Sequence, residues 1–194
     1  MLVSAIARFV RHHRTTTAED VTAFVRTLYP YIAAEYFLPW EPEELDDIIA
    51  HDIDVLDQLG LILTEGNQLS STGPATAHYA GLYDLAEIVE PVLERFYIVQ
   101  ALIIGNRQHD EESLETEASA IARKLSVLYG INSPTFFDQS LFRGFIDSLR
   151  RSDTIRDGID GIERGDGFDQ LLSTTAETLD ADIRYNVRQA LDVL

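Results

Sequence analysis

The chain has 194 residues, of which 45% are hydrophobic and 25% are charged, a balance typical of a folded globular protein rather than a disordered one. Its 33 Asp and Glu residues against 15 Lys and Arg residues give a formal net charge of −18, which disfavours bulk binding to nucleic acid or to anionic lipid. It contains no cysteine, which excludes a disulfide framework, a thiol nucleophile and a cysteine-based zinc site.

The first predicted element is a short basic helix at the N-terminus. Apolar residues at positions 3, 6, 7 and 10 recur at helical spacing, and the first fourteen residues include Arg8, Arg11 and Arg14 but no acidic residue. Such a helix can lie on anionic lipid, dock onto an acidic protein surface or simply join two domains. We therefore take Arg8, Arg11 and Arg14 as candidate residues for docking to a membrane or to another domain.

Two further helices are predicted before residue 60. Thr17 and Asp20 have the spacing of a capping box at the start of the first of them. Pro42 suits the first turn of the second, whose apolar residues recur at helical spacing up to Gly60. Gly60 is a natural stop for that helix.

A hairpin follows directly. Residues 61–63 and 68–70 are two short extended segments around a turn, and a helix followed by such a hairpin resembles a winged-helix unit. A linker rich in small residues and proline ends this part of the chain. We therefore expect a winged-helix-like domain over residues 1–76 and a second helical domain over residues 77–194.

The second half is predicted to surround a buried helix. A helical segment covers residues 82–90, restarts at Pro91 and continues through residues 96–104, where it is apolar on nearly every side. That apolar run is well short of the roughly 20 residues that a membrane-spanning helix needs. We therefore expect no transmembrane segment.

Three more helices are predicted after the buried one. The first opens in the acidic segment 110–117, the next starts at Ser133 and Pro134, and the last has Thr174 as its N-cap. Before the last helix, residues 154–169 are rich in Asp and Gly and follow a helix as the first hairpin does. The predicted fold class is therefore mainly α, a helical bundle with two short β-hairpins, compatible with two winged-helix-like units.

Two clusters of acidic residues allow a metal site. His51 lies among four aspartates between positions 47 and 57, although a single imidazole beside exposed acids is typical of a solvated helix face. Residues 157–161 resemble a calcium loop, but Ile162 occupies a place where an EF-hand needs an oxygen ligand, which favours a solvated turn. Glycine-rich phosphate loops and a Gly-x-Ser-x-Gly elbow are absent, and we expect no cofactor.

Several segments resemble the C-terminal half of bacterial glycerol-3-phosphate acyltransferases, in the same order. The most diagnostic stretch leads from Gly130 and Asn132 into Phe136, Phe137 and Asp138, which we take as a structural family signature. The segments that carry the resemblance are residues 29–32, 35–38 with Trp40, 94–99, 122–134 and 136–142.

The resemblance implies participation in the first acylation of phospholipid synthesis. The parent enzyme would move a fatty acyl group from acyl-CoA or acyl carrier protein to the 1-position of glycerol 3-phosphate. It would do so as a peripheral protein at the cytoplasmic face of the bacterial inner membrane. The family's catalytic domain lies N-terminal to the region that this chain resembles, so the implied partner is that domain, and the acyl donor would be met only through the parent enzyme.

The family's catalytic motif, a His with an Asp five positions later, is absent from the chain. A general base oriented by a carboxylate would act on the substrate hydroxyl. The residues five positions after the five histidines are Thr17, Ala18, Leu56, Tyr83 and Leu114. We therefore expect a non-catalytic region that supports or docks the catalytic domain and has no acyltransferase activity by itself.

Two alternatives follow from other features of the sequence. The first is a stand-alone winged-helix-like interaction or regulatory module, for which the acidic balance and the lack of a recognition helix rich in Arg and Lys argue against DNA as the target. The second concerns the aromatic residues of the second half. We expect them in the hydrophobic core, and the alternative is that they line a groove for an acyl chain. Those aromatic residues are Phe96, Tyr97, Phe136, Phe137, Phe142 and Phe145.

Overall fold

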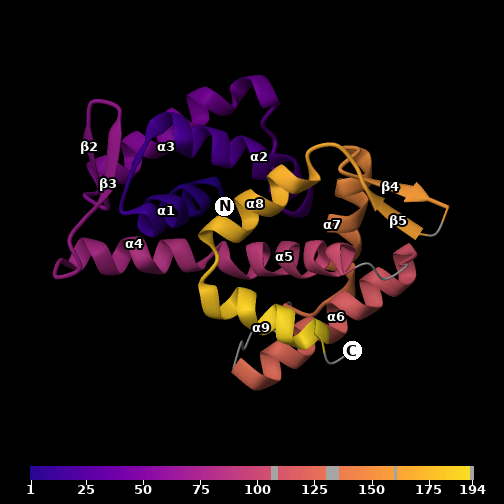
Figure 1. Ribbon diagram of the computed structural model, residues 1–194. Helices are drawn as coiled ribbons and strands as arrows, with labels where there is room; N and C mark the ends of the chain where they lie inside the picture. Colours follow the sequence, from indigo (N-terminus) through magenta and orange to yellow (C-terminus); the bar gives the residue numbers. More distant parts are fainter. Residues whose placement is uncertain (106–108, 130–135, 160, 193–194) are drawn as a thin grey trace. The chain divides into compact units, whose positions relative to one another are not determined.

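The computed structural model describes residues 1–105, 109–129, 136–159 and 161–192 (Figure 1). Over these residues the chain is mainly α, with nine α-helices, one 3-10 helix and five short strands in two antiparallel sheets, which confirms the predicted fold class. The chain forms two compact units, Met1–Glu90 and Pro91–Leu194. The division expected after residue 76 stays a prediction.

The first unit has the element order of a winged helix. Its three strands form one antiparallel sheet in the order β1-β3-β2, so that the hairpin β2-β3 is extended by the strand that follows the first helix. Its elements are α1 (Leu2–His13), β1 (Thr15–Thr17), α2 (Ala18–Tyr36), η1 (Pro42–Glu44), α3 (Leu45–Gln58), β2 (Ile62–Glu65), β3 (Gln68–Ser71) and α4 (Ala77–Glu87).

Local signals account for most boundaries of the first unit. The Thr17 hydroxyl accepts the Asp20 N–H while the Asp20 carboxylate accepts the Thr17 N–H, so the predicted capping box is confirmed. Pro42 opens the 3-10 turn that leads into α3, as expected. Strand β1 was not predicted, because three threonines carry no alternating pattern and their pairing with β3 is a tertiary contact.

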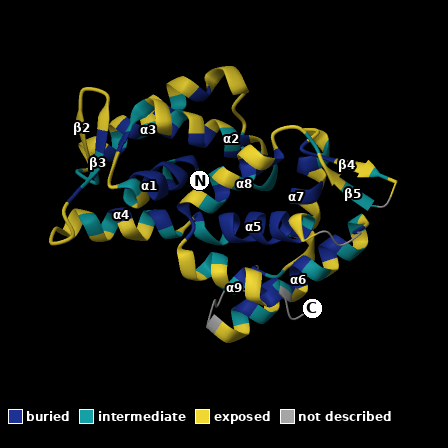
Figure 2. Ribbon diagram, in the orientation of Figure 1, coloured by how far each residue is buried: buried dark blue, intermediate teal, exposed yellow. Residues whose placement is uncertain are grey.

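Helix α1 is the centre of the first unit. It contacts α2, α3, α4 and strand β3, and Ile6 and Val10 on its apolar face are completely buried. Figure 2 shows the buried inner faces of these helices against an exposed outer surface. Burial of such side chains contributes on the order of 1.5–3 kcal/mol each, so this helix forms the core of the unit rather than an appendage.

The second unit is built on α5. Helix α6 contacts α7 and α9, and the hairpin β4-β5 follows α7 as β2-β3 follows α3 in the first unit. Its elements are α5 (Glu90–Ile104), α6 (Glu111–Tyr129), α7 (Gln139–Arg151), β4 (Ile155–Gly158), β5 (Gly161–Arg164), α8 (Phe168–Thr178) and α9 (Ala181–Asp192).

Helix α5 is the predicted buried helix. Every residue from 92 to 102 is buried, and the ring of Phe96 stacks on that of Phe145 with centroids 3.9 Å apart. Pro91 lies in its first turn, where a missing N–H costs nothing. Among the described residues, no helix is both long enough and apolar enough to cross a membrane.

Two predicted helix starts are wrong. Helix α7 begins at Gln139 rather than near Ser133, because the Asp138 carboxylate accepts the Ser140 N–H at 2.9 Å and caps the helix there. Ser133 and Pro134 themselves lie outside the described residues. Helix α8 begins at Phe168, and Thr174 lies within it, because burial of the Phe168 and Leu171 side chains extends the helix beyond the local capping pattern.

Candidate functional site

Arg8 of the predicted basic helix lies inside the first unit. Its side chain is 0% exposed, and its two terminal nitrogens lie 3.4 Å from Glu87 and 3.0 Å from Glu90. A buried guanidinium requires such partners, since an uncompensated buried charge costs several kcal/mol. The ion pairs of Arg8 therefore connect α1 to Glu87 of α4 and to Glu90, the first residue of α5.

Arg11 and Arg14 differ from Arg8 and from each other. Arg11 donates to Glu87 at 2.6 Å and lies over the ring of Tyr83, 4.1 Å from its centroid. Arg14 is exposed and ends α1 in a conformation with φ of 64°. Docking through the three arginines stays a prediction, and of the three only Arg14 presents an exposed side chain for it.

The family signature is described only in part. Gly130 and Asn132 lie outside the described residues. Phe136 is completely buried, and Asp138 is the exposed N-cap of α7. Hydrogen bonds from the N–H and the hydroxyl of Ser140 lower the pKa of Asp138, so it caps the helix as a carboxylate.

Phe137 joins the same turn to α6. The Ser119 hydroxyl donates to the Phe137 carbonyl at 2.7 Å, and the Arg123 guanidinium lies 5.3 Å from the centre of its ring. These contacts fix the path of the chain as it enters α7. The described side chains of the signature therefore pack into the core and cap α7, and a purely structural role for the whole signature stays a prediction.

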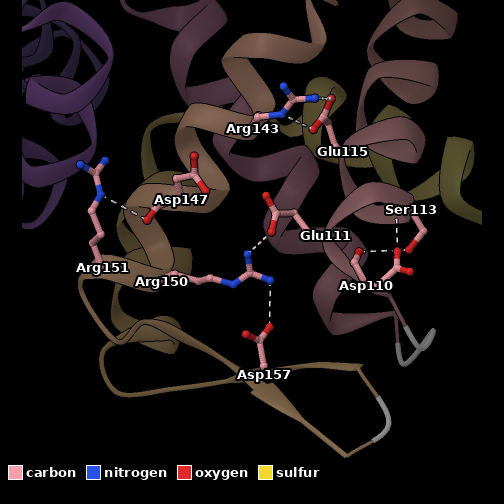
Figure 3. A network of polar contacts seen from close by, with 9 residues as sticks. All are labelled: Asp110, Glu111, Ser113, Glu115, Arg143, Asp147, Arg150, Arg151 and Asp157. Atoms are coloured by element: carbon pink, nitrogen blue, oxygen red, sulfur yellow. Dashed lines mark hydrogen bonds and ion pairs between the residues drawn. The ribbon is translucent and has the colours of Figure 1, made fainter.

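A network of ion pairs holds α6 to α7 (Figure 3). Glu115 is buried, and its two carboxylate oxygens accept from Arg143 at 2.8 and 2.9 Å. The hydrogen bonds that Arg143 donates to Glu115, and then the charge of Glu115, raise the pKa of Arg143. This bidentate geometry is the strongest form of a guanidinium–carboxylate pair.

Arg150 extends the network to the second hairpin. It donates to Glu111 of α6 and, at 2.8 Å, to Asp157 of β4 (Figure 3). Asp157 was considered as a calcium ligand, and in the structure its carboxylate is the partner of this arginine. These ion pairs connect α6, α7 and β4 to one another. They therefore position these elements and do not resemble a reactive site.

The metal site considered for α3, where the sequence favours a solvated helix face, has one histidine on an exposed face. His51 is exposed, and burial raises the pKa of the neighbouring Asp52 despite the histidine beside it. Across the described ranges, no group of three or more His, Cys, Asp and Glu side chains could hold a metal ion.

The second unit contains an open cleft of about 560 Å³ between α5, α8 and α9. Its lining is mainly apolar, with Asp169 and Arg188 as its charged members. Of the six aromatic residues considered for an acyl groove, Tyr97 lines this cleft, Phe137 is half-buried, and the other four are buried in the core. The expectation that these rings form the core is therefore confirmed for the five buried residues, Phe96, Tyr97, Phe136, Phe142 and Phe145.

A group of exposed aromatic side chains, not predicted from the sequence, lies at the end of α2. Tyr36, Phe37 and Trp40 are 39%, 89% and 36% exposed at the end of α2 and in the connection to α3. Figure 2 shows this connection as largely exposed. The signal that could have revealed it is the presence of three aromatic residues beside the helix breakers Pro39 and Pro42, where no core-forming periodicity continues.

Comparison with known proteins identifies the region. Residues 1–158 match the family model of the glycerol-3-phosphate acyltransferase C-terminal region. Proteins named glycerol-3-phosphate acyltransferase from Ectopseudomonas mendocina and Pseudomonas entomophila are each 36% identical, over 98% and 97% of this chain. One from Pseudomonas aeruginosa is 35% identical over 97% of it.

The match covers 24% of the Ectopseudomonas mendocina protein and 23% of the other two, so the chain spans about a quarter of the length of these relatives. No solved structure matches the chain. The family model covers more than half of the chain, including the signature segment between α6 and α7. The chain therefore belongs to the family of glycerol-3-phosphate acyltransferase C-terminal regions.

Proposed function

We propose that the chain is the non-catalytic C-terminal region of a glycerol-3-phosphate 1-O-acyltransferase and that it supports the catalytic part of that enzyme. The observation that carries the proposal is the match to a C-terminal region model together with the coverage of only a quarter of each relative. The absence from the sequence of a His with an Asp five positions later supports a role other than proton transfer.

The reaction of the parent enzyme is part of the proposal. It transfers a fatty acyl group from acyl-CoA or acyl carrier protein to glycerol 3-phosphate, the first step of phospholipid biosynthesis. The enzyme would act as a peripheral protein at the cytoplasmic face of the membrane. Within this chain the buried α5 and the ion-pair network between α6 and α7 provide a rigid support, because their side chains are fixed by packing and by paired charges.

Co-expression tests the supporting role. The part of the Ectopseudomonas mendocina relative outside the matched quarter is produced with a tag, together with this untagged chain, and the relative's own matched quarter serves as positive control. We expect this chain to co-purify in stoichiometric amount. If the positive control co-purifies and this chain does not, the proposed support of a catalytic part is wrong.

A free-standing interaction module is the second candidate function. The winged-helix order of the first unit favours it. The net charge of −18 argues against DNA as its target. Retention of the chain on DNA that weakens steeply with salt would support this candidate over the first, whereas flow-through at 50 mM salt would exclude DNA as its target.

A further inference from the structure

Phe37 occupies a position that disfavours it in two ways. It ends α2 with φ of 53° and ψ of 44°, and its N–H and that of Leu38 both bond to the Ala33 carbonyl. Helix ends of this left-handed kind usually carry glycine, because a side chain there is strained. The Phe37 ring is also 89% exposed to water. Neither the backbone nor the solvent favours a phenylalanine here, and positions that break local rules together are typical of function.

The backbone that carries this ring is held in place. The hydroxyl of buried Tyr29 donates to the Trp40 carbonyl, three residues after Phe37. The Glu41 N–H donates to the Glu44 carboxylate at 2.8 Å and closes the next turn. The aromatic side chains are therefore presented from an anchored connection, which lowers the entropic cost of binding through them.

Acidic residues follow the aromatic group directly in the sequence. Five carboxylates come within seven positions after Trp40, and one of them, Asp46, accepts a hydrogen bond from Arg26 at 2.9 Å. Tyr36, Phe37 and Trp40 form what we call the aromatic patch, and its acidic border consists of Glu41, Glu43, Glu44, Asp46 and Asp47. An aromatic centre with a charged border is the arrangement of a protein-binding hot spot.

We propose that the aromatic patch inserts into an apolar pocket, bordered by Lys and Arg, on the catalytic part of the same enzyme. The proposal rests on the proposed function above. The acidic border is complementary to a basic rim, whereas an anionic lipid surface or a second copy of this chain would repel it. The relatives carry this region in one chain with the remaining three quarters of their length, so that part is present at high effective concentration.

The test variant is Phe37→Gly, because glycine suits the left-handed position and removes only the ring. The affinity of the chain for the Ectopseudomonas mendocina part described above is measured by titration calorimetry. We expect Phe37→Gly to bind about 30-fold more weakly, as for other hot-spot aromatics. Leu63→Ser, which removes another exposed apolar side chain of the same unit, serves as the matched control and should bind as the wild type does.

Charge reversal provides the second arm. The double variant Glu41→Lys/Glu43→Lys should bind at least tenfold more weakly at 50 mM salt, with a smaller difference at 300 mM salt. Equal affinities of the wild type and Phe37→Gly would overturn the proposed binding role of the aromatic patch and leave the supporting role of the chain intact. No binding by the wild type would overturn the supporting role itself, and with it the patch.

A membrane is the competing occupant. Wild type and Phe37→Gly are sedimented with vesicles of phosphatidylethanolamine and phosphatidylglycerol. We expect no difference in the pelleted fraction. A loss of pelleting in the variant, with unchanged affinity for the catalytic part, would assign the patch to lipid and contradict the proposal.

Discussion

At the scale of single residues, the first unit contains side chains whose roles differ from their local sequence signals. Arg8 belongs to a basic segment that predicts surface docking, yet it pairs with carboxylates 79 and 82 positions away and has no exposed surface. Phe37 is a large apolar residue, a type that is usually buried, yet it is exposed. Both outcomes depend on tertiary contacts, which a local pattern does not contain.

Phe37 gives a stability prediction that is separate from binding. Phe37→Gly should be about 1 kcal/mol more stable than Phe37→Ala, because alanine keeps the strain of the left-handed conformation and glycine does not. Urea unfolding followed by the fluorescence of Trp40, the single tryptophan, measures the difference within the first unit. Equal midpoints for the two variants would show that the position is not strained.

Substitution of Arg8 should change the stability of the first unit more than the substitutions of Phe37 do. Arg8→Met should lower the free energy of unfolding by about 3 kcal/mol, because it leaves the largely buried Glu90 carboxylate without this partner. The double variant Arg8→Met/Glu90→Gln should lose less than the sum of the two single variants. The same Trp40 unfolding curves test this, and a loss below about 1 kcal/mol for Arg8→Met would mean that the pair does not stabilise the unit.

Glu87 makes the same cluster sensitive to acid. Burial by itself would raise the pKa of Glu87, but the hydrogen bond with Glu90 and the charges of Arg11 and Arg8 outweigh it and lower the pKa. A lowered pKa in the folded state gives stability that is present above the unfolded pKa of about 4.3 and is lost as pH falls through the folded value. Glu87→Gln should therefore flatten the pH dependence of unfolding below pH 5, and an unchanged slope would contradict this assignment.

At the scale of elements, the sequence predicted those whose signals are local. The capping box of α2, the hairpin β2-β3 and the buried α5 are confirmed, since each follows from spacing or composition within a few residues. The starts of α7 and α8 were misplaced because a cap and a buried face compete with nearby patterns. Strand β1 was missed because only its pairing with β3 defines it.

The hairpin β4-β5 provides a prediction at this scale. Arg150→Met removes the bonds to Glu111 and Asp157, which join the hairpin to α6. Amide exchange in residues 155–158 should become about fivefold faster, since two partly exposed pairs contribute about 1 kcal/mol together. Arg151→Met is the matched control, because Arg151 is exposed and, among the described residues, its side chain donates to the Asp147 carbonyl of its own helix. Equal exchange in the two variants would mean that Arg150 does not hold the hairpin.

At the scale of the whole molecule, the sequence already indicated the family and the absence of its catalytic motif. Residues 122–134 and 136–142 resemble the family in sequence alone, and the family match confirms this resemblance. Composition does not indicate which surface of the chain binds a partner, because the net charge of −18 is spread over both units. The aromatic patch became visible only when exposure and backbone conformation were known together.

The most direct measurement is an acyltransferase assay with glycerol 3-phosphate and an acyl-CoA. It compares this chain alone, the Ectopseudomonas mendocina relative without its matched quarter, and the two combined. The account predicts no activity for the chain alone and a gain of activity in the combination over the shortened relative. Acyl transfer by the chain alone, or a combination no more active than the shortened relative when the relative's own quarter restores activity, would contradict it.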